Sequence, residues 1–135
     1  MPRNLYVNLP VKDLERSVDF FDTLGFSFNP KFTNENAACL IINERTSVML
    51  LVEDFFAGFT KKPIADARAS TETLLALSLD SRAQVHEFMT KALAAGADPT
   101  VEARDYGFMY QHGFADPDGH QWEVFWMDEA QMPTS

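Results

Sequence analysis

An internal repeat is the sequence feature that most constrains the fold. Three residues that begin or face a predicted helix recur 67 positions further along the chain: Asp13, Val18 and Phe21 as Asp80, Val85 and Phe88. That spacing is close to half of the 135-residue chain. Because the order of predicted elements repeats as well, the sequence predicts a duplicated module. A sheet with a helix on one face must bury its other face, so a cleft is expected between the modules.

The first module covers about residues 1–53. Apolar residues alternate with polar ones over residues 5–9, which predicts a strand that Pro10 ends. Asp13 is expected to cap the helix that follows, and Gly25 is well placed to end it. Strand-like runs follow at residues 26–32, 38–42 and 48–52. The first module is therefore predicted as β, α, β, β, β.

The second module covers about residues 72–128 and repeats this order. Residues 74–79 are predicted as a strand, and Ser81 with Gln84 forms a capping box for a second helix that Gly96 ends. Strand-like runs follow at residues 100–103, 108–115 and 121–126. The predicted fold class is therefore α+β, with two tandem βαβββ modules forming a curved mixed sheet around a cleft.

The turn between the last two predicted strands has a specific sequence. Residues 116–119 read Asp-Pro-Asp-Gly, which puts proline second and glycine fourth in a four-residue turn. Proline favours the second position of a type I turn and glycine the fourth, so a hairpin is predicted here.

The connection between the modules, residues 54–71, is long and carries three aromatic residues. Phe55, Phe56 and Phe59 could close the cleft as a lid, pack on a partner subunit or form a satellite of the core. A connection of this length is also expected to contain a short helix or to act as a lid.

The charge of the chain excludes some partners. Twenty acidic against eleven basic residues give a net charge of −9, whereas nucleic acids and anionic membranes need a basic surface. The charge is compatible with a cationic ligand or simply with solubility. The single cysteine, Cys39, allows no intrachain disulfide, and the N-terminus lacks the apolar segment of a signal peptide. We therefore expect a cytoplasmic protein with no membrane or nucleic-acid partner.

Residues 8–26 read NLPVKDLERSVDFFDTLGF and residues 114–126 read FADPDGHQWEVFW. Both segments resemble the vicinal-oxygen-chelate superfamily of glyoxalases, bleomycin-resistance proteins, extradiol dioxygenases and fosfomycin-resistance enzymes. The segments KPIADARAST and DYGFMYQHGF are similar to a bacterial stand-alone subgroup labelled glyoxalase- or dioxygenase-like by homology. The resemblance implies one domain over residues 1–135.

The resemblance also implies where metal ligands would lie. In metal-dependent members each module supplies one ligand on its first strand and one on its last. These positions fall on Tyr6 and Leu50 in the first module and on Leu74 and Glu123 in the second. Leucine has no lone pair to offer a divalent ion, so we expect no metal and no cofactor.

Glu123 and His112 are the candidate catalytic residues. Glu123 lies in an apolar strand, where burial would raise its pKa and suit it to proton transfer; the alternative is a structural carboxylate bonded to a nearby hydroxyl. His112 shares a strand face with Tyr110 and is an acid–base candidate if that face lines the cleft. Residues expected to contact a ligand are Tyr6, Asn8, Leu50, Leu74, Tyr110 and Phe125.

These features favour a protein that binds a small molecule, cationic or aromatic, in a metal-free cleft. The alternatives are a metal-dependent lyase, isomerase or extradiol-type dioxygenase, and a metal-free acid–base enzyme that uses Glu123. Exposed sheet edges and the habits of the superfamily predict a homodimer.

Overall fold

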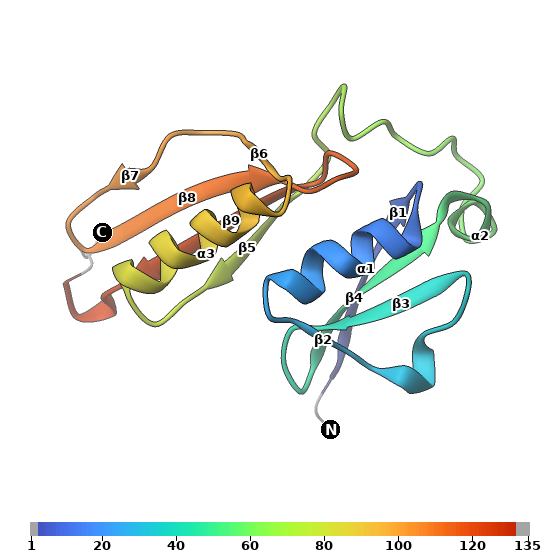
Figure 1. Cartoon of the computed structure of the whole chain (residues 1–135), viewed down its shortest axis with the longest axis horizontal. Helices are drawn as coiled ribbons and strands as arrows, with labels where there is room; N and C mark the ends of the chain where they lie inside the picture. Colours follow the sequence, from blue (N-terminus) through green and yellow to red (C-terminus); the bar gives the residue numbers. More distant parts are fainter. Residues whose placement is uncertain (1–2, 132–135) are drawn as a thin grey trace. The chain divides into compact units, whose positions relative to one another are not determined.

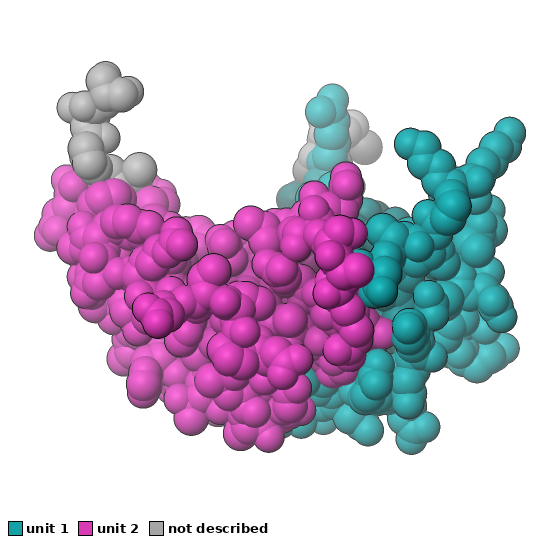
Figure 2. Space-filling model, turned by 90° about the horizontal axis from the view of Figure 1, so that it is seen from above, with its two compact units in different colours: residues 1–66 teal, residues 67–135 magenta. Residues whose placement is uncertain are grey.

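The computed structural model of the chain describes residues 3–131. It has an α+β fold that divides into two compact units, residues 1–66 and 67–135. Figure 1 traces the elements and Figure 2 colours the two units separately. Each unit contains its own mixed sheet and its own covering helix, so the units are described one at a time.

The first unit contains a four-stranded sheet in the order β1-β4-β3-β2. The outer strand β1 runs parallel to β4, and the other pairs are antiparallel. The elements, in chain order, are β1 Leu5–Val11, α1 Leu14–Thr23, β2 Ser27–Phe28, the 3₁₀ turn η1 Pro30–Phe32, β3 Ala37–Ile41, β4 Thr46–Val52 and α2 Glu53–Ala57. The predicted order β, α, β, β, β is confirmed in this unit.

The second unit repeats the topology with a five-stranded sheet in the order β5-β9-β8-β6, and β7 also pairs with β8. Its outer strand β5 is again parallel to its neighbour, β9. The elements are β5 Leu74–Ser78, α3 Arg82–Ala94, β6 Asp98–Pro99, β7 Arg104–Asp105, β8 Met109–Ala115, β9 Gln121–Met127 and the 3₁₀ turn η2 Glu129–Gln131. The predicted duplication is therefore present in the strand order itself.

The helix caps follow the sequence but shift the register of the repeat. Asp13 accepts a hydrogen bond from the backbone N–H of Arg16 and begins α1. The matching cap of α3 is Ser81, which accepts from the N–H of Gln84, and Asp80 lies one residue before it. The counterpart of Asp13 is therefore Ser81, 68 residues further on, and the 67-residue spacing is one residue short. Both helices end at a glycine with positive φ, Gly25 and Gly96.

Pro10 does not end the first strand, since β1 continues to Val11. Strand β1 pairs with β4 on one side only and forms the edge of its sheet. A proline lacks a backbone N–H, and an edge strand tolerates that loss. The prediction that residues 26–32 form one strand is also wrong: only β2 pairs, because Pro30 starts η1.

The predicted strand at residues 100–103 is the clearest error in the second unit. Two short segments, β6 and β7, both pair with β8, and the chain leaves the sheet between them. Thr100 still donates its N–H to the carbonyl of Gly113, at 3.4 Å. Val101, which suggested a strand, lies in the excursion with 39% of its surface exposed.

The hairpin at residues 116–119 is confirmed, and Asp116 holds it together. One carboxylate oxygen of Asp116 accepts the backbone N–H groups of Asp118 and His120, each at 3.0 Å. The other oxygen accepts the indole N–H of Trp122 at 3.1 Å. Asp116 is buried, and burial raises its pKa against the opposing effects of His120 and these hydrogen bonds.

A short segment before β5, residues 67–71, crosses this hairpin, and we call it the strap. The Arg68 guanidinium donates to the carbonyl oxygen of Pro117, and Thr71 accepts a hydrogen bond from the amide of Gln121 at 3.0 Å. Gly119 has a φ of +90°, and a Cβ there would lie 3.1 Å from the Arg68 nitrogen. The glycine therefore permits both the turn and the close approach of the strap.

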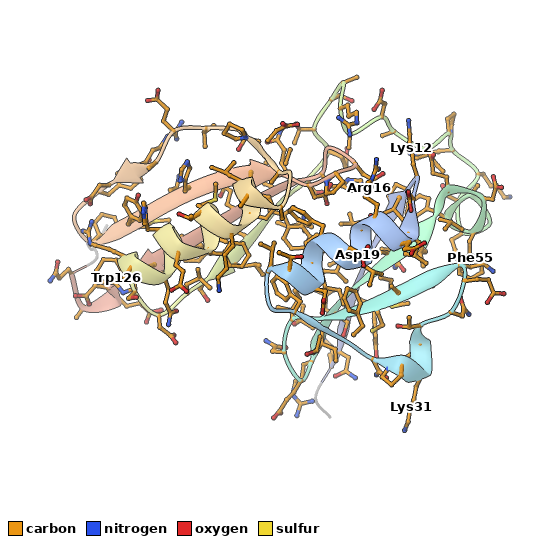
Figure 3. All side chains as sticks on the ribbon, in the orientation of Figure 1. Lys12, Arg16, Asp19, Lys31, Phe55 and Trp126 are labelled. Carbon is orange, nitrogen blue, oxygen red and sulfur yellow. The ribbon has the colours of Figure 1, made fainter. Side chains whose placement is uncertain are left out.

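The connection between the units begins with the expected short helix, α2. Its Phe55 packs edge to face on Phe59 with ring centroids 5.2 Å apart. Both rings stay accessible, with 40% of Phe55 and 71% of Phe59 exposed. Figure 3 labels Phe55 on α2. A role for these rings as a lid or a subunit contact stays a prediction. Among the described residues no helix combines the length and apolar character needed to cross a membrane.

Candidate functional site

The two faces of the second sheet have different surroundings. Phe114 on β8 packs on Phe88 of α3 with ring centroids 5.9 Å apart, which identifies the helix-covered face. Trp122 and Val124 alternate with Glu123 along β9, and both are almost fully buried. Because successive side chains of a strand point to opposite faces, Glu123 lies on the face away from α3.

We call this the open face of the second unit. The strand registers assign to it Leu74, Ala76, Ser78, Asp98, Arg104, Met109, Gln111, Gly113, Ala115, Gln121, Glu123, Phe125 and Met127. Apolar and polar side chains are mixed in the set, and Glu123, Arg104 and Asp98 are its charged members. Three of the predicted site residues, Leu74, Glu123 and Phe125, therefore share one face.

Glu123 has few polar neighbours on this face. Its strand partners are Ala76 on one side and Gly113 on the other. Its side chain is partly exposed, and its carboxylate accepts no hydrogen bond from the described residues of its own unit, 67–131. A structural carboxylate would be bonded to a neighbouring hydroxyl or amide. The free carboxylate favours the alternative role, contact with a ligand.

Arg104 is a site residue that the sequence reasoning missed. It pairs with Gln111, which pairs in turn with Phe125, so all three lie in one row across the open face. Its side chain has no hydrogen-bond or ion-pair partner within residues 67–131. The signal that could have found it is the alternation around Asp105, but β7 was not predicted as a strand.

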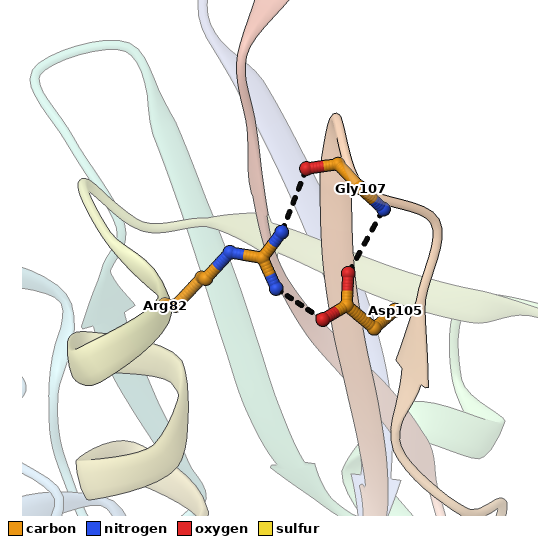
Figure 4. A network of polar contacts seen from close by, with 3 residues as sticks. All are labelled: Arg82, Asp105 and Gly107. Carbon is orange, nitrogen blue, oxygen red and sulfur yellow. Dashed lines mark hydrogen bonds and ion pairs between the residues drawn. The ribbon is translucent and has the colours of Figure 1, made fainter.

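A polar network fixes the orientation of β7 (Figure 4). Arg82, the first residue of α3, forms an ion pair with Asp105 and donates to the carbonyl of Gly107 at 2.7 Å. The N–H of Gly107 donates back to Asp105 at 2.9 Å. The hydrogen bond from Arg82 is the main reason that the pKa of Asp105 lies below its ordinary value. Since Asp105 turns toward α3, the neighbouring Arg104 turns toward the open face.

His112 and Tyr110 do share a face, but it is the one that α3 covers. His112 pairs with Val124, and Tyr110 pairs with Trp126. The Arg82 guanidinium lies over both aromatic rings of the latter pair, 5.8 Å from the Tyr110 centroid and 5.1 Å from that of Trp126. These residues therefore lie on the side opposite Glu123, and His112 cannot share a substrate with Glu123 on one face.

The surroundings of His112 also shift its titration. Partial burial under α3 lowers its pKa, and the nearby charge of His86 lowers it further. A neutral imidazole against a helix is consistent with a packing role.

The first unit has an equivalent open face with different chemistry, and part of it is covered, since Cys39 and Leu51 are almost fully buried there. Tyr6 and Asn8 lie on it, as predicted from their spacing of two, and 47% of Tyr6 is exposed. Leu50 does not lie there: it pairs with Leu9 on the helix-covered face and is completely buried. The open-face residue next to Asn8 is Met49, so Met49 occupies the position that the sequence analysis gave to Leu50.

The residues on the open faces do not fit a catalytic divalent metal. A metal ion needs several oxygen, nitrogen or sulfur donors in one place. The strand partners of Glu123, Ala76 and Gly113, have no donor side chain, and the polar groups near it are the neutral amide of Gln121 and the hydroxyl of Thr100. Within residues 3–131 no three His, Cys, Asp or Glu side chains are grouped so that they could hold a metal. We therefore derive no step through a metal.

Comparison with known proteins supports the α+β fold with two similar units. Residues 3–43 match a family model described as bleomycin resistance protein-like N-terminal. No protein of curated function matches the chain by sequence.

Solved structures match over nearly the whole chain. A hypothetical protein from S. aureus is 25% identical with a TM-score of 0.79, over 93% of this chain and 94% of that one. A glyoxalase/bleomycin resistance protein/dioxygenase family enzyme from Burkholderia phytofirmans PsJN is 18% identical with a TM-score of 0.75, over 90% and 96%. TnmS3, an antibiotic binding protein from Streptomyces sp. CB03234, is 19% identical with a TM-score of 0.67, over 94% and 97%.

These matches define the class of protein. The chain has the fold of the glyoxalase, bleomycin-resistance and dioxygenase proteins. The resemblance seen in the sequence is therefore matched by the fold and, over residues 3–43, by the family model.

Proposed function

We propose that this protein binds a small cationic, aromatic molecule on the open face of the second unit without the help of a metal. The observation that carries the proposal is the Glu123 carboxylate, which accepts no hydrogen bond in the described part of its own unit and lies on one face with Ala76 and Phe125. A carboxylate of this kind can pair with the charge of a ligand cation, and such charge-assisted hydrogen bonds are the stronger ones.

Apolar neighbours suit the aromatic part of such a ligand. Phe125 lies two residues from Glu123 on the same face, and Leu74 on β5 has 54% of its surface exposed. An aromatic ring prefers offset or edge-to-face contact with another ring, which Phe125 can provide. The similarity of the fold to an antibiotic binding protein supports binding as the activity.

Metal-dependent lyase, isomerase or dioxygenase chemistry has less support. Three of the four implied ligand positions carry tyrosine or leucine, and Leu50 is buried away from any ligand. Acid–base catalysis by Glu123 and His112 together is disfavoured because they lie on opposite faces of one sheet. The expected cleft and the homodimer stay predictions.

The test uses 4-(aminomethyl)biphenyl, a cation attached to two planar rings, in isothermal titration calorimetry. Glu123→Gln should weaken binding by about ten- to a hundredfold, the loss expected when a hydrogen bond to a charged group is removed. Glu44→Gln is the matched control, because Glu44 is exposed in a turn of the first unit and its replacement changes the net charge equally. Equal affinity of Glu123→Gln and the unmodified protein would contradict the proposal.

A further inference from the structure

The open face of the second unit carries a positive charge at a defined distance from Glu123. Glu123 lies on β9 opposite Gly113 of β8, and Arg104 lies on β7 opposite Gln111 of β8. The two charged residues are therefore two strands apart and two residues apart along the strand direction. With strands about 4.8 Å apart and about 3.4 Å per residue, their Cα atoms are separated by about 12 Å.

The surface around these charges combines apolar and polar side chains. Phe125 and Gln111 occupy the row of Arg104, and Met109 pairs with Met127 in the row beyond it. Methionine side chains are flexible and polarisable, and they adapt to aromatic surfaces. Gly113 adds no side chain of its own, and the Thr100 hydroxyl fills the space over it, with Oγ1 2.7 Å from where a Cβ would be, so a polar group lies beside Glu123 on this face.

Arg104 is available to a ligand, and the position of Asp105 fixes the side of the sheet on which the Arg104 side chain lies. Its guanidinium has no partner in the described part of the second unit. The neighbouring Asp105 is held on the opposite side by Arg82 and Gly107 (Figure 4). Arg82 is thus a positioning residue that acts on Arg104 through β7, on the far side of the sheet from any ligand.

We infer that the open face of the second unit takes a dipolar ligand whose ammonium end pairs with Glu123 and whose carboxylate end pairs with Arg104. This inference rests on the proposed function and names the class of ligand for the same surface. Arginine binds carboxylates through two parallel hydrogen bonds, which gives orientation as well as affinity. A ligand with opposite charges at the two ends of a flat aromatic body would bind in one direction only.

The test compares 4′-(aminomethyl)biphenyl-4-carboxylate with its methyl ester in the same calorimetric assay. The two probes share the ammonium group and the rings, and they differ only in the negative charge. The acid should bind about tenfold more tightly than the ester. Because Arg104 is exposed, this advantage should shrink as the salt concentration rises from about 0.05 to about 0.5 M.

Variants show which residue is responsible for the tighter binding of the acid. Arg104→Gln should abolish the preference for the acid, whereas Arg45→Gln, a change at an exposed arginine of the first unit, should leave that preference intact. Arg82→Gln should reduce the preference although Arg104 is still present, and a circular dichroism melt checks that the variant is folded. The preference of Arg82→Lys should fall between those of the unmodified protein and Arg82→Gln.

Each outcome separates the inference from the proposed function. If neither probe binds, or if both bind independently of Glu123, the proposed function fails. If the ester binds through Glu123 but the acid gains nothing, the dipolar inference alone is overturned. A preference for the acid that survives Arg104→Gln also overturns it.

Discussion

The two units have the same strand order but differ in the chemistry of their open faces. In the second unit Glu123 lies between Ala76 and Gly113, and in the first unit the equivalent position between Asn8 and Cys39 is Met49. The residues that the registers assign to the open face of the first sheet are uncharged: Tyr6, Asn8, Pro10, Ser27, Ala37, Cys39, Ile41, Ser47, Met49 and Leu51. The two units therefore share their strand order, whereas charged side chains lie only on the open face of the second unit among the residues that the registers assign.

The largest expected change in the free energy of unfolding comes from a pair of variants that tests which face of β4 belongs to the core. Leu50→Ala should lower the free energy of unfolding by about 2–5 kcal/mol, because it leaves a cavity under α1. Met49→Ala, one residue away on the open face, should cost less than about 1.5 kcal/mol, since its side chain is only partly buried. Urea denaturation measures both. A larger loss for Met49→Ala would reverse the assignment of Met49 as the counterpart of Glu123.

The turns before β4 and β9 offer a second contrast. Asp116 and Asn43 both accept two backbone N–H groups, but Asp116 is buried and also holds the Trp122 indole, whereas Asn43 is exposed. Asp116→Ala should cost about 2–3 kcal/mol, because it leaves buried donors without an acceptor. Asn43→Ala should cost about 0.5–1 kcal/mol.

Thermal and urea unfolding of the two alanine variants measure this contrast. Trp122→Phe serves as the control, because it removes the indole donor and so reports how much of the Asp116 effect depends on the ring. Equal losses for Asp116→Ala and Asn43→Ala would show that the buried hydrogen bonds of the second turn add nothing.

The smallest expected effect is on the pH dependence of stability, and it comes from His112 on the helix-covered face of the second unit. Burial lowers the pKa of His112 below 6.5, so the unfolded chain binds its proton more readily than the folded one. The stability contributed by neutral His112 is therefore present above about pH 6.5 and is lost as the pH falls through the lowered pKa. His112→Gln should remove this loss, an effect below about 1 kcal/mol between pH 7.5 and 5.5.

Urea unfolding at the two pH values measures this difference. His86→Gln is the companion variant, because it removes only the lesser contribution of the neighbouring imidazole charge. An unchanged pH dependence in His112→Gln would show that the imidazole is as well hydrated in the folded protein as in the unfolded chain.

The sequence predicted the framework well because its signals are local. The caps Asp13 and Ser81, the glycines Gly25 and Gly96 and the turn at residues 116–119 each act within a few residues. The errors arose where partners distant in sequence decide the structure. Pro10 is accepted in a strand because β1 is an edge, which only the sheet order reveals.

The candidate site was predicted in part for the same reason. Glu123 and Phe125 were both predicted as site residues, and the strand register puts them on one face. Assigning Leu50 instead of Met49 was a slip of one residue, and such a slip moves a side chain from one face of a sheet to the other. Arg104 was missed because its position depends on pairing with β8 and on the Arg82–Asp105 ion pair, 23 residues apart in sequence.

The strap has a consequence for any attempt to study the second unit alone. Strand β5 begins at Leu74, but Arg68 and Thr71 already bind the last hairpin and Gln121. A fragment that starts at β5 would expose Gly119 and leave these acceptors and donors to water. An autonomous second half must therefore begin no later than Ala67, several residues before its first strand.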